Sequence, residues 1–141
     1  MHYDDIVSCL FCRIVLGEIP STRIFEDLTT FAFMDINPGT RGHALVIPKV
    51  HAVDLHDVPP DVLGDMARTA QRVARAAKEH LGCGGVNLVQ SSGAVAFQSV
   101  FHIHIHVIPR YEGDGVRLPW TPKPGDKDDI TAAAEKLRKG F

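Results

Sequence analysis

Residues 101–108 read Phe101-His102-Ile103-His104-Ile105-His106-Val107-Ile108, so three histidines alternate with residues that favour β-strands. Successive side chains of a strand point to opposite faces of its sheet. We therefore expect the three histidines to share one face and the aliphatic residues to pack on a core. The alternative is a half-buried strand whose solvent face happens to carry histidine. Thr, Lys or Glu ordinarily fill such a face, so the row predicts a chemical site.

The spacing of the row indicates that its histidines have different roles. Alternate residues of a strand lie about 6.6–6.8 Å apart, which separates His102 from His106 by roughly 13 Å. Zinc–nitrogen bonds are about 2.0–2.1 Å long, so one metal ion does not easily bind all three imidazoles. One end of the row could bind metal. A neutral imidazole is also a nucleophile or proton-transfer group near pH 7.

The composition is that of one soluble domain, with 141 residues, 45% hydrophobic and 23% charged. A net charge of −2 without a basic block argues against nucleic acid bound on a broad electrostatic patch, but not against a small anionic ligand. The apolar runs are too short to span a bilayer, and residues 1–5 lack the features of a signal peptide. We expect a cytoplasmic protein that binds no membrane.

Three cysteines in such a chain favour metal or thiol chemistry over a disulfide framework. Cys9 and Cys12 form a C-x-x-C pair in a short helical turn, which is either half of a zinc site or a redox pair. A redox pair of the thioredoxin type would follow a strand, and no strand signal precedes Cys9. A zinc site needs two more ligands elsewhere. Cys83 is expected to be a lone thiol in a turn.

The other elements follow from hydrophobic periodicity and from breaker residues. Further strands are expected at 23–26, 29–34, 43–48 and 86–90, the first two forming a hairpin. One long helix spans 59–81 and ends at the following glycines, with its basic residues in solvent. No repeat or linker divides the chain, so we expect one domain over 1–141. Its irregular tail begins near residue 111 and leads to a terminal helix over 130–139.

Two polar loops lie beside these strands. Residues 35–42 form a turn-rich loop, which is either a ligand-binding loop or a plain connection. Ser91-Ser92-Gly93 and Gln98-Ser99 belong to a hydroxyl-rich segment whose N–H and O–H groups suit phosphate oxygens. The sequence contains no P-loop or G-x-G-x-x-G motif. A histidine beside such donors therefore favours transfer at phosphorus.

Together these motifs resemble the histidine triad (HIT) family. Residues 102–108 match its His-φ-His-φ-His-φ-φ signature, and matches in order and spacing extend over 9–12, 33–38, 42–49, 51 and 98–101. The resemblance implies an α+β fold: an antiparallel sheet of about five strands, one long helix and short terminal helices, usually as a homodimer. It also implies nucleotidyl hydrolysis or transfer. The candidate substrates are purine nucleotide conjugates, namely phosphoramidates, adenylyl anhydrides or dinucleoside polyphosphates.

The resemblance also implies a role for each site residue. His104 is the nucleophile that attacks the α-phosphorus and forms a nucleotidyl-histidine, and His106 lies by the phosphate and the leaving group. The positions matched to nucleotide binding are Asp35 at the ribose, His43 near the site, and Ser91, Gln98 and Ser99 near the phosphate. Bacterial zinc-containing relatives imply a structural Cys2His2 zinc site made of Cys9, Cys12, His51 and His102.

Several alternatives remain open at this point. The chain could be a nucleotide-binding regulatory module with little turnover, or a metalloenzyme in which zinc activates water. The cysteines and histidines could also lie together without metal. Ser91-Ser92 replaces an amide-rich pair of many relatives, and Phe97 stands where glycine often precedes the glutamine. Both departures leave the identity of the substrate open.

Overall fold

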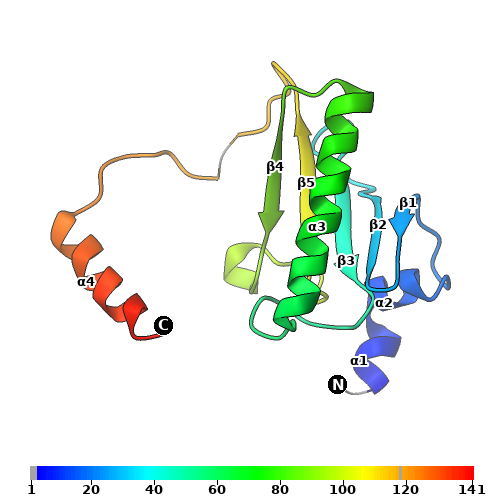
Figure 1. Ribbon diagram of the computed structural model, residues 1–141, viewed down its shortest axis with the longest axis horizontal. Coiled ribbons are helices and arrows are strands. Elements are labelled where there is room, and N and C mark those ends of the chain that lie inside the picture. Colours follow the sequence, from blue (N-terminus) through cyan, green and yellow to red (C-terminus); the bar gives the residue numbers. More distant parts are fainter. Residues whose placement is uncertain (1–2, 118) are drawn as a thin grey trace.

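The computed structural model describes residues 3–117 and 119–141, with only the backbone for residues 3 and 4. Its centre is an antiparallel sheet of five strands in the order β1-β2-β3-β5-β4 (Figure 1). The strands are β1 (Arg23–Glu26), β2 (Thr30–Met34), β3 (Ala44–Pro48), β4 (Gly85–Gln90) and β5 (Ile105–Arg110). The helices are α1 (Tyr3–Ser8), α2 (Leu10–Val15), α3 (Pro60–Ala76) and α4 (Lys127–Arg138). The expected α+β class and the single long helix are confirmed.

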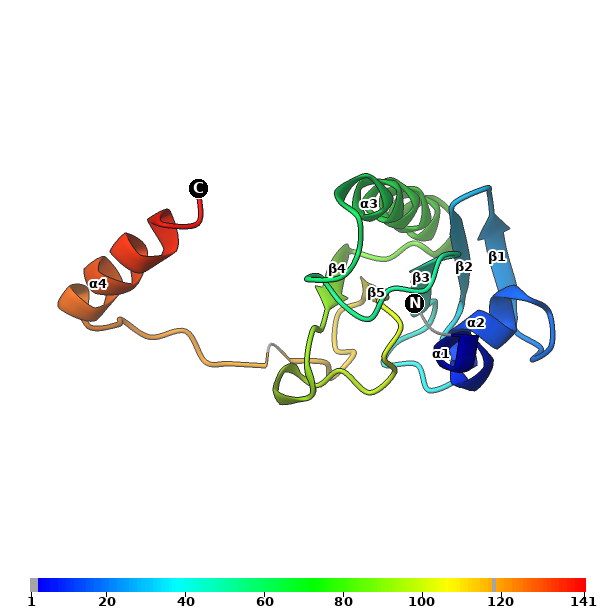
Figure 2. The same ribbon diagram turned by 90° about the horizontal axis from the view of Figure 1, so that it is seen from below.

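Helices cover the sheet from both sides. The long helix α3 lies on one face, and α1 and α2 lie on the other (Figure 2). The core beneath α3 is formed by small and aliphatic side chains, including Val46, Met66, Ile103, Ile105 and Val107. A second, more aromatic core lies on the α2 side and includes Phe11, Phe31, Phe33, Leu45 and Ile47. The aliphatic residues of the histidine stretch therefore share one core face, as their alternation predicted.

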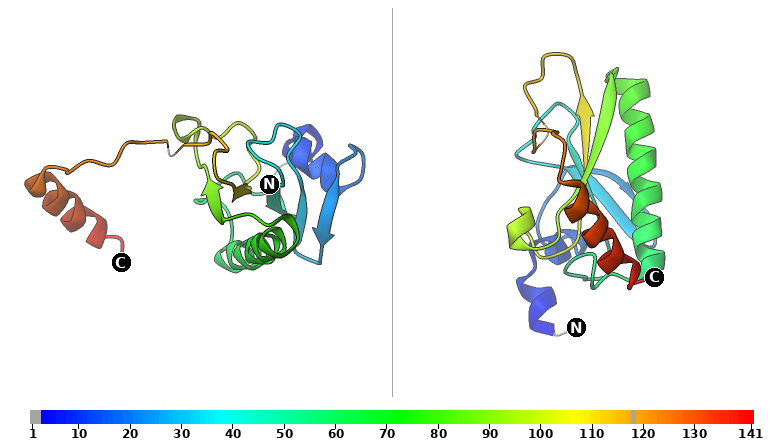
Figure 3. Two further views of the ribbon diagram at one scale, coloured as in Figure 1. Left: turned by 90° about the horizontal axis from the view of Figure 1, so that it is seen from above. Right: turned by 90° about the vertical axis from the view of Figure 1, so that its left-hand side faces the viewer.

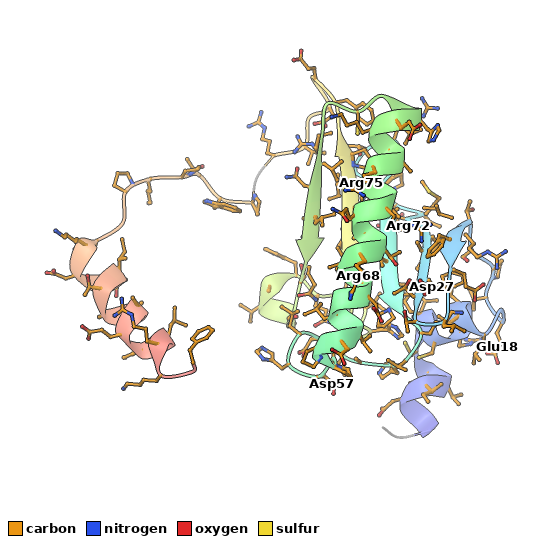
Figure 4. All side chains as sticks on the ribbon, viewed as in Figure 1. Glu18, Asp27, Asp57, Arg68, Arg72 and Arg75 are labelled. Carbon is orange, nitrogen blue, oxygen red and sulfur yellow. The ribbon has the colours of Figure 1, made fainter. Side chains whose placement is uncertain are left out.

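The basic residues of α3 are exposed. Arg68, Arg72 and Arg75 follow one another along the solvent side of the helix (Figure 4). The Arg72 guanidinium lies 4.3 Å from the centre of the Phe25 ring, a cation–π contact at the edge of the sheet. After Ala76 the helix widens into one π-turn over Ala77–Leu81, and Gly82 ends it in the left-handed conformation at φ 68°.

The histidine stretch is a strand over a shorter length than its alternation predicts. Strand β5 begins only at Ile105 and runs through Pro109 to Arg110, although we expected strand from 102 and an end at Pro109. Ile105 pairs with Val46 on one side and with Gln90, the last residue of β4, on the other. Continuing this register would place His104 opposite Ile47 and Ile103 opposite Pro48, which has no N–H to donate, and β4 has already ended at Gln90. Residues 101–104 are therefore irregular backbone, tied by Ile103 N–H to the carbonyl of Ala52 at 2.7 Å.

The loop between β2 and β3 is closed by its own main chain. Asp35 N–H donates to the carbonyl of His43 at 3.0 Å, and Asn37 N–H donates to Asp35 Oδ1 at 2.8 Å. Gly42 has φ 89°, and a Cβ there would lie 2.5 Å from Leu81 Cδ1, so both the backbone and the space favour glycine. These constraints position Asp35 and His43, which stand on opposite sides of the loop.

The C-terminal segment leads away from the sheet. In all views the chain after β5 extends to α4, which stands apart from the other elements (Figure 3). The helix begins earlier than expected because Asp126 caps it, its Oδ2 accepting from Asp129 N–H at 2.9 Å. Trp120 in this segment is 62% exposed. Within the described ranges, every helix is too short or too polar to cross a membrane.

Candidate active site

Four potential metal ligands converge where α2 meets the start of the histidine stretch. Cys9 and Cys12 come from α2 and its N-cap, His51 follows β3, and His102 precedes β5. Their ligand atoms all lie within 4.8 Å of one another. His102 Nδ1 is 3.4 Å from Cys9 Sγ and 3.5 Å from Cys12 Sγ, and His51 Nδ1 is 3.3 Å from Cys12 Sγ. The residues matched from the family thus meet in one cluster.

The distances and burial of this cluster fit a tetrahedral zinc ion. Typical zinc–sulfur and zinc–nitrogen bonds separate the two ligand atoms by about 3.6 Å, close to the separations found. His102 Nε2 donates to the carbonyl of Pro48 at 2.8 Å, which leaves Nδ1 without a proton and directed to the thiols. Burial raises the pKa of the Cys12 thiol to about 12, helped by Cys9. Two adjacent buried sulfurs become thiolates readily only beside a cation.

His104 presents a nucleophilic nitrogen because of a main-chain contact. Its Nδ1 is 2.8 Å from the carbonyl of His102, and a carbonyl oxygen only accepts, so the proton of the neutral ring resides on Nδ1. Nε2 therefore carries the free electron pair. Burial lowers the pKa of His104, although the hydrogen bond to His102 and the charge of Asp35 oppose this. The ring is 5% exposed and is held edge-on against Phe11, with 5.2 Å between the ring centres.

His106 lies next to His104 and contacts a second histidine. The ring centres of His104 and His106 are 5.0 Å apart. His106 Nδ1 lies 2.9 Å from Nε2 of His43, and Asp35 Oδ2 lies 3.4 Å from the same His43 nitrogen. Burial, together with the neighbouring His104 and His43, lowers the pKa of His106 to about 4, although the charge of Asp35 opposes this. Both triad histidines that face the cavity are thus neutral at pH 7.

These two histidines line a cavity of about 370 Å³ between α2 and the β2–β3 loop. Its polar groups are few, chiefly Asp35, Asn37, Ser21 and Ser99, and the rest of its lining is apolar: Leu10, Phe11, Ile14, Ile19, Pro20, Phe33, Met34, Ile36, Leu45 and Val100. A mostly apolar pocket with a few directed polar groups is typical of a site for a flat organic group such as a base. Asp35, which the family resemblance assigns to the ribose, is one of these polar groups.

The comparison with known proteins decides the family. The family model described as a HIT domain matches residues 16–113. The chain belongs to the HIT family. It is 49% identical over 108 residues to an uncharacterised HIT-like protein of Mycobacterium tuberculosis, covering 77% of this chain and 75% of that protein. It is 40% identical over 131 residues to an adenosine 5′-monophosphoramidase of Saccharomyces cerevisiae, covering 92% and 80%.

One solved structure of a HIT protein contains zinc. The crystal structure of a zinc-bound histidine triad family protein from Mycobacterium smegmatis is 44% identical and superposes with a TM-score of 0.77, covering 96% of this chain and 99% of that one. The HIT fold expected from the sequence is therefore confirmed. Zinc is bound in that relative, and the Cys/His cluster of this chain has a composition that suits it.

The loop matched to phosphate binding in HIT proteins contributes unequally to the cavity. Of the described residues, Ser99 lines it, whereas Ser91 and Gln98 do not. The polar atoms of the Gln98 side chain all have main-chain partners: Oε1 accepts from Gly93 N–H at 2.8 Å, and Nε2 donates to the carbonyls of Val53 and Val100 at 2.7 and 3.1 Å. Gln98 thus holds the loop that carries Ser99 against the body of the protein.

Sequence reasoning missed two contributors to this HIT site. Phe11, between the two cysteines, contacts the rings of both His102 and His104 at centre distances of 5.9 and 5.2 Å. Gly39 N–H donates to His43 Nδ1 at 2.9 Å. The position of Phe11 inside the C-x-x-C pair was a usable signal, because residues inside a metal turn lie close to its ligands. The contact of Gly39 had no such signal, since any residue but proline supplies the same N–H.

Proposed function

We propose that this HIT protein hydrolyses purine nucleotide conjugates through a covalent intermediate on His104. The observation that supports this proposal most directly is the hydrogen bond from His104 Nδ1–H to the carbonyl of His102, which leaves the free electron pair of the ring on Nε2. That ring lines a largely apolar cavity with Asp35 among its few polar groups. The similarity to an adenosine 5′-monophosphoramidase supports the reaction class, and phosphoramidates are the first substrates to test.

The proposed reaction has two displacements at the α-phosphorus. In the first, the Nε2 electron pair of His104 forms a bond to phosphorus, and the bond to the leaving group breaks with its electron pair. His106 stands beside His104 to hydrogen-bond the departing atom, and a leaving amine takes its final proton from water. In the second, water attacks phosphorus, the phosphorus–nitrogen bond breaks, and the electron pair returns to Nε2. The products are a nucleoside monophosphate, the leaving group and a proton released to solvent.

Trapping the intermediate tests the mechanism directly. When the protein is mixed with a purine nucleoside phosphoramidate labelled at the α-phosphorus and quenched in base within milliseconds, we expect label on the protein. A phosphorus–nitrogen bond to histidine is stable in base and labile in acid, so the label should be lost on acid treatment. Peptide mapping should place it on His104. Full turnover with no protein-bound label, or tight binding of the monophosphate with negligible turnover, would contradict the proposal.

We propose a structural zinc ion on Cys9, Cys12, His51 and His102. The four side chains supply a closed Cys2His2 set, and His102 Nε2 is already held by the Pro48 carbonyl, which orients Nδ1. Such an ion ties α2 to the segment that carries the catalytic histidine. The three cysteines are unpaired, which suits a reducing compartment, so the proposed location is the cytoplasm.

We further propose a homodimer of single-domain chains formed along β4. This edge of the sheet carries no charged residue and leaves Leu88 and Val89 51% and 41% exposed. The opposite edge, β1, has charges at Arg23 and Glu26 and a register shift, features that discourage pairing. An uncharged edge with exposed apolar residues is the better surface for a second copy.

Sedimentation of the protein at micromolar concentration checks the dimer. We expect the wild-type chain to sediment at twice the monomer mass and Leu88→Lys to weaken association by at least about tenfold, because it places a charge in the interface. Leu28→Lys is the matched control, since this leucine is 95% exposed in the turn between β1 and β2. A wild-type monomer, or equal weakening by both variants, would contradict the proposal.

A further inference from the structure

The β2–β3 loop holds His43 in one tautomer. Gly39 N–H donates to His43 Nδ1 at 2.9 Å, so this nitrogen offers an electron pair and carries no proton. A neutral imidazole has one proton, which must then reside on Nε2. The Asp35 carboxylate, 3.4 Å from Nε2, favours the same placement. A second proton on Nδ1 would oppose the Gly39 N–H directly, so the loop disfavours the charged ring as well.

The state of His43 determines that of His106. Their nitrogens, Nε2 of His43 and Nδ1 of His106, are 2.9 Å apart, which is a hydrogen-bond distance. Because His43 holds its proton on Nε2, it is the donor and His106 Nδ1 is the acceptor. Asp35 cannot replace it as partner of a His106 Nδ1 proton, since Oδ2 is 3.9 Å from that nitrogen. The proton of neutral His106 therefore resides on its Nε2.

We propose that His43 is a positioning residue that makes His106 a hydrogen-bond donor toward the leaving group. The main-chain N–H of Gly39 sets this arrangement, because it determines which nitrogen of His43 carries the proton. The inference deepens the function proposed above and rests on it. In the described part of the chain, His106 Nε2 has no hydrogen-bond partner, and the ring lines the cavity beside His104. Two adjacent histidines thus hold opposite tautomers: His104 offers an electron pair and His106 offers an N–H.

This arrangement matters chemically because the two rings need opposite properties. The attacking ring must supply electrons, while the neighbouring ring must stabilise the negative charge that develops on the departing atom. In the other tautomer, His106 would present an electron pair to that atom and repel it. The benefit depends on the leaving group: an alkylamine needs a donor, whereas p-nitrophenolate departs as a stable anion.

The nitrogen chemical shifts of the His106 ring test the tautomer. In ¹⁵N-labelled wild-type protein we expect a pyridine-type Nδ1 and a pyrrole-type Nε2, with the signals assigned by their absence in His106→Gln. In His43→Leu the donor is gone, and the two tautomers should mix. In His43→Gln the amide still offers an N–H, so the wild-type pattern should return at least in part. A wild-type His106 protonated on Nδ1 would overturn the inference without touching the proposed nucleophile.

The dependence on the leaving group tests the consequence. In single-turnover experiments we expect His43→Leu to slow label transfer from a nucleoside 5′-alkylphosphoramidate by about tenfold, the value of one lost hydrogen bond. Transfer from a nucleoside 5′-p-nitrophenyl phosphate should change less than about twofold, and His43→Gln should restore part of the first rate. Equal slowing of both substrates would indicate a merely structural role and overturn the inference. Absence of any wild-type label would instead refute the proposed function, while the tautomer measurement still stands.

Discussion

Replacing His104 with alanine should lower turnover of a purine nucleoside phosphoramidate by on the order of 10⁴-fold or more, the scale on which nucleophile removal acts in enzymes that form covalent intermediates. The variant removes the only nitrogen that the structure shows to hold a free electron pair beside the cavity, among the residues it describes. The measurement is kcat with a continuous assay of the released amine. Nucleotide affinity should change far less, because the apolar lining is intact.

Two further variants make this result specific. His80→Ala also removes an imidazole, but its side chain is 72% exposed after α3, so turnover should stay within about twofold of wild type. His104→Gly leaves a space that free imidazole can enter, so added imidazole should restore part of the turnover. If His104→Ala keeps more than about a tenth of wild-type kcat, His104 is not the nucleophile.

Replacing Cys12 with alanine should remove zinc and cost several kcal/mol of unfolding free energy. Three remaining ligands no longer complete the closed set, and structural zinc sites contribute folding free energy directly. For a chain of this length, a loss of about 4 kcal/mol lowers Tm by roughly 10–20 °C. Zinc per chain, measured by elemental analysis after purification without added metal, should fall from about one to near zero.

Cys83→Ala is the matched control for this experiment. Cys83 is also a buried thiol, 6% exposed, but it lies after α3 and outside the cluster. It should keep full zinc and lose only about 1 kcal/mol. A catalytic zinc that activates water predicts a different pattern, in which Cys12→Ala stays folded with an unchanged Tm and loses all chemistry. Zinc well below one per wild-type chain would contradict the metal site altogether.

The elements of this fold were predictable wherever a local rule determines them. Alternation along 102–107 placed Ile103, Ile105 and Val107 in the core beneath α3, and the three-to-four-residue step placed the α3 arginines in solvent. The family resemblance predicted that four residues distant in sequence form one metal cluster, and their ligand atoms lie within 4.8 Å of one another. In each case the property depends on neighbours along the chain or on a motif with fixed spacing.

What the sequence could not predict depends on contacts between distant segments. Strand β5 begins at Ile105 opposite Gln90, the last residue of β4, although β3 continues to Pro48, and the sequence of β5 contains no sign of this. The tautomer of His104 depends on the carbonyl of His102, which is free to accept only because the backbone there is irregular. Gln98 was expected near the phosphate because of the loop in which it lies. Its side-chain amide is hydrogen-bonded to main-chain groups of that loop and of the Val53 segment, and no local pattern indicates these contacts.

The hydrogen bond from His104 to the His102 carbonyl has a consequence for protein engineering. The acceptor is main chain, so no amino-acid replacement at position 102 deletes it, whereas the partner of His106 is a side chain that every amino-acid replacement at position 43 alters. Under the mechanism proposed above, libraries randomised at position 43 would therefore vary how the protein treats different leaving groups and leave the proposed attacking nitrogen as it is. Selection for new conjugates should begin at this position, whose side chain lies 2.9 Å from His106.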